Sequence, residues 1–307
     1  MAWQVLLAII ETCVLFAVGG GALKLGCIGR DDIGRWSRLT FNVFTPCLTF
    51  AAVAENIGRD ELKSLWIMPV AGFAIMAAGA LLGIVFLPLV SCRTPERKAT
   101  FVHVCAINNY IFLPLIVVNN LFGFGRHAAL LMVANVGSTV GFWTIGVVAL
   151  TGMRRDTLRT ALRQLYSINV VAVALAVAAV MWRIPIPPEV MKIVRTLGSL
   201  AIPLTLILTG AALFRDAHGL FLHKADAFVV AVTRLAVIPA IYVIVLKLLP
   251  LPRDMYEVCF VISLMPAAVS SALVARLYGG DGDFASQSVV TTTLLAMVSV
   301  PLWIKLL

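Results

Sequence analysis

The sequence predicts an all-α polytopic membrane protein with ten transmembrane helices, and two features of its composition carry that prediction. Of the 307 residues, 61% are hydrophobic and 13% are charged, whereas roughly a quarter of the residues in soluble domains are charged. The apolar residues also fall into blocks of about 20 residues or more, which is the length that an α-helix needs to cross a bilayer. A soluble enzyme or binding domain of this size would need a charged surface that this chain does not supply.

Ten apolar blocks follow one another along the chain, and the loops between them are too short to hold a soluble domain. The predicted spans cover residues 4–25, 36–55, 64–91, 99–122, 127–151, 161–182, 190–213, 226–249, 255–278 and 285–306. No basic residues precede the first block, as they would in a cleaved signal peptide, so we expect this block to be a retained helix.

The basic residues predict how the chain is oriented. With the N-terminus outside, the loops after the odd-numbered helices carry 14 of the 24 Lys and Arg, the opposite loops carry 9, and Arg234 lies inside a span. The positive-inside rule then places both termini outside a cell membrane, the inner membrane if the source is bacterial. These loops account for the net charge of +9. Nucleic acid is not expected as a partner, because no basic face with interleaved aromatic residues is present.

An internal repeat divides the ten predicted helices into two halves, residues 1–153 and 154–307. Pro46 in the second block and Pro203 in the seventh each follow a small polar residue by four positions, and Pro114 and Pro266 lie within the fourth and ninth blocks. Because each half has an odd number of helices, the second half must be inverted relative to the first. Inverted repeats are typical of secondary transporters.

Pro114 and Pro266 point to a candidate binding site. Proline removes a backbone donor and clashes with the preceding turn, so both residues should break or kink their helices. Paired breaks in corresponding helices indicate a site near the bilayer midplane, and helix N-termini that face such a gap suit a carboxylate. The alternative is that each proline makes an ordinary kink.

Polar side chains lie beside both prolines. Asn108, Asn109 and Tyr110 precede the first, and Ser270 and Ser271 follow the second. We expect the amides to line a cavity. The serines either line the same cavity, bond to carbonyls of their own helix, or sit where helices pack.

Two ionisable residues inside predicted spans are further candidates, since charged groups in a bilayer are rare and often functional. Arg234, in the eighth block, either balances the charge of an anionic substrate or extends to the membrane interface. Glu11, in the first block, is either a proton-coupling carboxylate or a group within reach of the outer interface.

Motifs for enzymes are absent from the sequence. It contains no Walker A, GxSxG or HExxH pattern, and its six cysteines and four histidines lack the spacing of metal ligands. We therefore expect no enzymatic activity, no cofactor and no metal.

Several segments resemble the auxin efflux carrier family, which includes plant PIN-type carriers and bacterial malonate or malate permeases. They are residues 264–281, with Pro301 and Trp303 after them, residues 42–46, Asn169, and residues 203–210. The likeness extends over essentially the whole chain. It implies ten helices in two inverted five-helix repeats, with helices 4 and 9 broken at proline and crossing each other. It also implies an elevator motion in which helices 1, 2, 6 and 7 form the scaffold. Ile107 and Phe112 depart from the Asn and Gly that the family usually has there.

These observations together lead us to expect a secondary transporter, or permease, for a small organic anion such as a carboxylate, with the lipid bilayer around it. A homodimer through the scaffold helices is the candidate assembly. The alternatives are a membrane-embedded anion-binding receptor or sensor, and an anion channel. Proton coupling and facilitated diffusion both stay open as energy sources.

Overall fold

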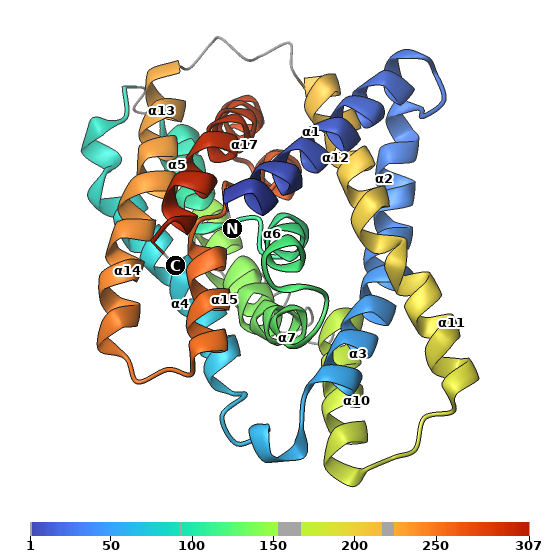
Figure 1. Cartoon of the computed structure of the whole chain (residues 1–307). Coiled ribbons are helices and arrows are strands. Elements are labelled where there is room, and N and C mark those ends of the chain that lie inside the picture. Colours follow the sequence, from blue (N-terminus) through green and yellow to red (C-terminus); the bar gives the residue numbers. More distant parts are fainter. Residues whose placement is uncertain (1, 92–93, 153–166, 217–223, 307) are drawn as a thin grey trace.

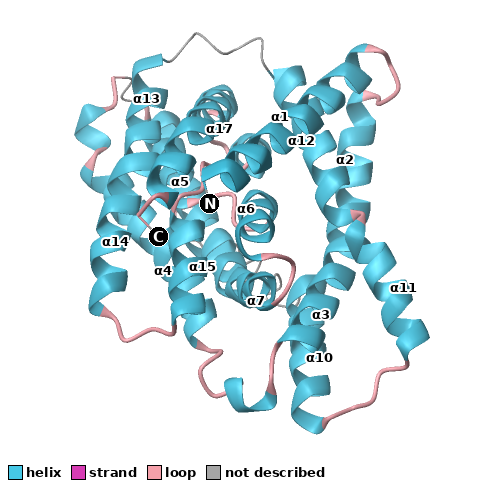
Figure 2. Cartoon of the chain, in the orientation of Figure 1, coloured by secondary structure: helices cyan, strands magenta, loops and turns pink. Residues whose placement is uncertain are grey.

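The computed structural model describes residues 2–91, 94–152, 167–216 and 224–306. Within these ranges the chain consists of helices and the loops that join them, and the β-structure is one isolated antiparallel bridge between Asn108 and Ala267 (Figure 2). The boundary expected at residues 153 and 154 lies outside the described residues. So do several of the basic residues that predicted the orientation, namely Arg93, Arg154, Arg155, Arg159 and Arg163.

The helices of the first part of the chain are α1 (Ala2–Lys24), α2 (Arg30–Leu39), η1 (Thr40–Phe44), α3 (Thr45–Asn56), η2 (Arg59–Glu61), α4 (Ile67–Val85), η3 (Leu87–Leu89), α5 (Pro95–Ala106), α6 (Phe112–Phe122), α7 (Arg126–Gly141), η4 (Phe142–Gly146) and α8 (Val147–Thr151). Those of the second part are α10 (Ile168–Trp182), α11 (Pro188–Ser199), α12 (Ala201–Asp216), α13 (Lys224–Val232), η6 (Thr233–Val237), α14 (Ile238–Leu248), α15 (Arg253–Ser263), α16 (Ser270–Leu277) and α17 (Gly282–Ile304).

Five helical segments of the described chain are long and apolar enough to cross a membrane: Ile67–Val85, Arg126–Thr151, Pro188–Arg215, Ala225–Leu248 and Gly282–Ile304. Two shorter apolar helices, Phe112–Phe122 and Ile168–Trp182, accompany them. The chain is therefore an all-helical protein with several apolar helices of membrane-spanning length, as its composition predicted.

Among the described residues, three of the longer helices contain a turn of π-helix and continue through it. These turns are η1, η4 and η6. Pro46 follows η1 by two residues and Pro239 follows η6 by two residues. A proline cannot donate to the carbonyl one turn earlier, and a widened turn before it lets the helix continue without a clash.

Two other helices are interrupted completely. Residues 107–111 separate α5 from α6, and residues 264–269 separate α15 from α16. Pro266 lies within the second interruption, as expected. Pro114 instead is the third residue of α6, so the first interruption comes before it. A proline in the first turn of a helix costs no hydrogen bond, because the amides there have no partner within the helix.

The helices form two groups that lie side by side (Figure 1). In one group α1 packs on α12, and α3 packs on α10 and α11. In the other group α4 packs on α5 and α7, and α17 packs on α13 and α16. The interrupted helices belong to the second group, and α6 and α7 bring it against α1 and α3.

Candidate functional site: the crossing of two interrupted helices

The two interrupted segments cross and hydrogen-bond to each other. The amide of Asn109 donates to the carbonyl oxygen of Pro266 at 2.8 Å, and the amide of Ala268 donates to the carbonyl oxygen of Ile107 at 3.0 Å. A helix that breaks at membrane depth leaves backbone groups that must find partners inside the protein. Here the two interruptions supply some of those partners for each other, which fixes where they cross.

Two polar side chains strengthen the crossing. Asn108 is fully buried, and its Nδ2 atom donates to the carbonyl oxygen of Ile262, in the last turn of α15, at 3.1 Å. Thr292 of α17 accepts a hydrogen bond from the amide of Ala267 through its Oγ1 atom at 3.2 Å. The Oδ1 atom of Asn108 is buried and has no hydrogen-bond partner in the part of the chain that the structure describes.

Arg234 ties the ends of two helices together at the same place. Its side chain is fully buried; Nη1 donates to the carbonyl oxygen of Cys105 at 2.9 Å, and Nη2 donates to that of Met265 at 3.0 Å. The carbonyl of Cys105 lies in the last turn of α5, and that of Met265 lies two residues after the end of α15, so both are next to helix C-termini, which carry partial negative charge. A Cβ atom on Gly79 of α4 would lie 3.2 Å from Nη1 and 2.4 Å from the oxygen of Cys105, so glycine leaves the room that this arrangement needs.

The crossing has a positive electrostatic character. The buried carboxylates of the described chain are Asp226 and Glu257, and both are paired elsewhere. Asp226 lies 3.3 Å from Arg97, and Glu257 lies 2.8 Å from His127. The guanidinium of Arg234 therefore faces helix ends rather than a carboxylate. The N-termini of α6 and α16 add partial positive charge beside the crossing.

A polar cavity adjoins the crossing at Ile111. Its polar lining consists of Thr45, Thr49, Asn135, Thr139 and Asn169, from α3, α7 and α10. The Oδ1 atoms of Asn135 and Asn169 are buried and, among the described residues, have no hydrogen-bond partner. Unpartnered buried acceptors are costly, and the cavity volume of about 20 Å³ is enough for one water molecule or one small donor group that would satisfy them. The cavity lies at the boundary between the two groups of helices.

Asn135 and Thr139 were not predicted as site residues from the sequence. The available signal was their spacing, because polar residues four positions apart in an apolar helix lie on one face. Thr45 and Thr49 show the same spacing in α3. The two pairs face one cavity.

Most of the residues predicted from the sequence lie at or near the crossing. Asn109 and Tyr110 are partly buried in the first interruption, and Pro114 is buried in α6. Ser271 is fully buried, and its hydroxyl has no partner within the described residues. Ser270 is exposed at the first position of α16.

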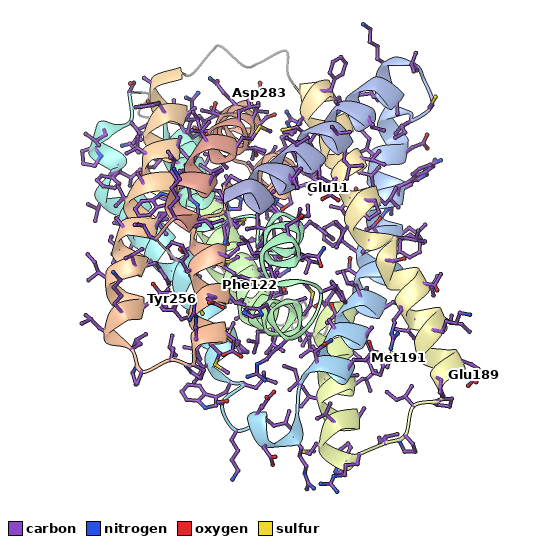
Figure 3. All side chains as sticks on the ribbon, viewed as in Figure 1. Glu11, Phe122, Glu189, Met191, Tyr256 and Asp283 are labelled. Carbon is purple, nitrogen blue, oxygen red and sulfur yellow. The ribbon has the colours of Figure 1, made fainter. Side chains whose placement is uncertain are left out.

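Glu11 stands apart from this group of residues. It is exposed on α1 (Figure 3), and its Oε2 atom accepts a hydrogen bond of 3.5 Å from Nδ2 of Asn120 on α6. The structure therefore brings the predicted amides, prolines and arginine together but leaves this carboxylate on the surface of α1.

Comparison with known proteins gives a consistent result. The family model described as "Membrane transport protein" matches residues 4–164 and 155–304. An uncharacterized transporter of Methanothermobacter thermautotrophicus is 25% identical over 300 residues, which is 96% of each chain. The protein PIN-LIKES 7 of Arabidopsis thaliana is 33% identical over 82 residues, which is 27% of this chain and 20% of that protein. An uncharacterized transporter of Schizosaccharomyces pombe is 33% identical over 124 residues, 39% of this chain and 27% of that protein.

The family match extends over nearly the whole chain and covers each of the two interrupted helices. It agrees with the apolar helices and with the transporter names of the relatives. The chain is thus a membrane transport protein of the auxin efflux carrier family, and not an enzyme.

Proposed function

We propose that this protein is a secondary transporter that moves a small organic anion, a carboxylate, across the cell membrane. The observation that carries the proposal is the fully buried guanidinium of Arg234, which hydrogen-bonds to backbone carbonyls and has no carboxylate partner among the described residues. A buried positive charge of this kind is costly unless other charge compensates for it. Part of that compensation comes from helix ends, and an anion in the site supplies the rest.

The carboxylate would bind beside the crossing, where the first amides of α6 and α16 lack acceptors within their helices. Asn109, three residues before α6, and Ser270, the first residue of α16, would add side-chain hydrogen bonds. The void beside Asn135 and Asn169 measures about 20 Å³, so a single hydroxyl or N–H group of the solute, or one bridging water, would donate to their buried amide oxygens. The walls of the proposed site would also include Asn108, Tyr110, Pro114, Pro266 and Ser271.

Ten membrane helices in two inverted five-helix repeats, residues 1–153 and 154–307, form the architecture that we propose. The ten are α1, α2 with α3, α4, α5 with α6, α7 with α8, α10, α11 with α12, α13 with α14, α15 with α16, and α17. The interrupted helices are then the fourth of each half. Their equivalent position supports an inverted repeat, since paired broken helices mark the binding site of such transporters.

An elevator motion is the mechanism that the packing favours. The scaffold would be α1, α2 with α3, α10, and α11 with α12, and the remaining helices would carry the crossing as one body. The polar cavity lies between the two bodies, lined by α3 and α10 on one side and α7 on the other. A sliding boundary needs imperfect packing of this kind, whereas close-packed cores resist displacement.

The orientation, coupling and assembly are parts of the same proposal. Both termini would lie outside, and a homodimer would form through the scaffold. Glu11 is the candidate proton-coupling group, and its exposure on α1 gives it access to solvent or lipid headgroups. Collapsing the pH gradient during uptake separates the two mechanisms: proton-coupled accumulation against the solute gradient stops, whereas the rate of equilibration by facilitated diffusion is unchanged.

Transport by the purified protein in proteoliposomes tests the proposal. At least one of the three labelled acids malonate, malate and indole-acetate should exchange against an unlabelled pool inside the vesicles. A carrier moves its solute across the membrane, whereas a receptor does not. Asn109→Ala should lower that exchange at least about tenfold, the size expected when a charge-assisted hydrogen bond is lost. Asn56→Ala is the matched control, because the Asn56 amide bonds to its own helix at the carbonyl of Ala52. If none of the three acids exchanges, the carboxylate assignment is wrong.

A further inference from the structure

A large apolar crevice opens between α1, α12 and α17, and the proposed function does not use it. Its volume is about 620 Å³, and Phe16, Phe214, Leu294 and Met297 supply much of its lining. Lys24, in the last turn of α1, lies at its rim and is exposed. Figure 1 shows α1 beside both of the other helices.

A second, narrower void continues the crevice toward the crossing. It shares Phe16, Thr293 and Met297 with the first, and it ends against Leu113 and Val117 of α6. Leu113 is the second residue of α6. The two voids together therefore run from a cation at the end of α1 to the start of the half-helix at the crossing.

Along one edge of the crevice α1 packs tightly against α12. A Cβ atom on Gly19 would lie 1.9 Å from the carbonyl oxygen of Ile207, and one on Gly210 would lie 2.1 Å from that of Phe16. These contacts press α1 against α12. A Cβ atom on Gly21, which lines the crevice, would meet nothing within 4 Å. The void is therefore a local feature of the side facing α17.

Water is a poor occupant for this space, because it needs polar partners and apolar cavities tend to stay dry. The polar groups of the lining are few, chiefly Cys13, Thr293 and Lys24. Protein interiors are otherwise close-packed, so a cavity of this size calls for an apolar occupant. Helices that cross a membrane are surrounded by acyl chains, which are apolar, flexible and narrow enough to enter.

We propose that the crevice is a binding site for one acyl chain of an anionic phospholipid, with its headgroup phosphate at Lys24. An exposed lysine at the membrane surface attracts anionic headgroups, and an ammonium group is a compact partner for a phosphate. A small hydrophilic carboxylate would find few hydrogen-bonding groups in the crevice. The bound chain would separate α1 and α12 from α17 and α6, the same boundary along which the proposed elevator motion would occur.

The test uses purified, delipidated full-length protein in detergent and follows its apparent unfolding temperature. Addition of dioleoyl-phosphatidylglycerol should raise that temperature by several degrees, since a ligand of the folded state stabilises it. Dioleoyl-phosphatidylcholine should raise it less, and inorganic phosphate alone should not raise it. Lys24→Gln should remove the preference for the anionic lipid and keep the smaller response to phosphatidylcholine.

Filling the crevice provides the decisive variants. Gly21→Leu places a side chain in open space inside the crevice and should abolish the response to phosphatidylglycerol. Gly34→Leu is the control, because Gly34 is also helical and free of neighbours within 4 Å of an added Cβ, but it is exposed and does not line the crevice. Met297→Trp fills the crevice from α17 if Gly21→Leu does not yield folded protein.

Three outcomes would overturn the proposal. They are an equal lipid response in the wild type and in both filled variants, a response to phosphate without lipid, and a response to malonate that the filled variants lose. The last would make the crevice part of the solute pathway. None of these measurements depends on transport activity, so the lipid site can fail while the proposed function stands, and the reverse also holds.

Discussion

The two interruptions that cross at the candidate site are held in different ways. The first, residues 107–111, carries its own polar side chain in Asn108, which reaches across to the carbonyl of Ile262. The second, residues 264–269, consists of apolar residues, alanines and Pro266, and it depends on groups from other helices. Thr292 of α17 accepts from its Ala267 amide, and Arg234 of η6 donates to its Met265 carbonyl.

This difference suggests that the two interruptions have different roles in the site. An interruption with its own amides can offer side chains to a solute, whereas one fixed by neighbouring helices offers mainly its backbone. We therefore expect the first interruption to determine which solute binds and the second to maintain the shape of the crossing. Arg234 is the common element, because it bonds to a carbonyl on each side.

The largest expected effect comes from Arg234→Met, which removes the common element. It leaves the carbonyls of Cys105 and Met265 buried without these donors, at a cost of about 1–3 kcal/mol each. We expect a marked fall in the yield of folded protein and in its unfolding temperature. Arg234→Lys, which keeps the charge and one donor, should be intermediate.

Arg195→Met is the control for the loss of an arginine. Arg195 forms an exposed ion pair with Glu55 near the end of α3, and such pairs contribute little in water. An unfolding temperature for Arg234→Met as high as that of this control would mean that the two carbonyls do not depend on Arg234.

The next prediction separates two neighbouring amides. Asn108→Ala should lower the free energy of unfolding by about 1–2 kcal/mol, because its buried hydrogen bond to Ile262 is lost. Asn109→Ala removes a partly buried side chain and should leave the unfolding temperature nearly unchanged while lowering exchange of the labelled carboxylate. Thermal unfolding and proteoliposome exchange, measured on both variants, check the division. It fails if both variants lose stability and transport to the same degree.

A smaller effect is expected in the second interruption. Thr292→Val keeps the shape of the side chain but removes the acceptor for the Ala267 amide, which should cost about 1 kcal/mol. Thr291→Val, one position earlier and only partly buried, should change the unfolding temperature less. If the two variants unfold alike, the backbone of the second interruption is fixed by other contacts, and the contrast between the interruptions weakens.

The sequence predicted the parts of this site that depend on local chemistry. Pro266 signalled a break or a kink because a proline inside a helix lacks the amide hydrogen bond and clashes with the preceding turn, and the amides beside Pro114 stood out in an apolar block. The position of the first interruption could not be predicted in the same way, because Pro114 is equally compatible with the first turn of a helix.

Long-range partners lay beyond the reach of the sequence. Arg234 bonds to Cys105, 129 positions away, and to Met265, 31 positions away. Only the folded chain shows that its donors meet helix ends. The polar cavity was missed for a related reason, since Thr45, Asn135 and Asn169 face one another only after three separate helices have packed.

The smallest expected effect is at the N-terminal end of α15 and depends on pH. Asp254, in the first turn of α15 and outside the five long candidate spans, hydrogen-bonds to Arg126. Partial burial acts to raise the pKa of this carboxyl, but the hydrogen bond and charge of Arg126 together with the amide of Met255 outweigh it and hold the pKa below its usual value. A lowered pKa in the folded state stabilises the protein above the unfolded value of about 4, and the contribution is lost as pH falls through the folded pKa.

We therefore expect Asp254→Asn to lower the free energy of unfolding at pH 7 by no more than about 1 kcal/mol, because solvent screens the pair, and to unfold at a slightly lower temperature than wild type. The difference should shrink as the pH approaches 3. A difference that persists unchanged at low pH would show that the carboxylate charge does not determine the stability difference.

The N-terminal end of α5 differs from that of α15, because Arg97 is buried between Asp226 and Asp281. Breaking a buried pair leaves a charge without compensation, so Arg97→Gln should cost more than Asp254→Asn at neutral pH. The helix that precedes the first interruption, α5, would then be held more firmly at its N-terminal end than α15, which precedes the second.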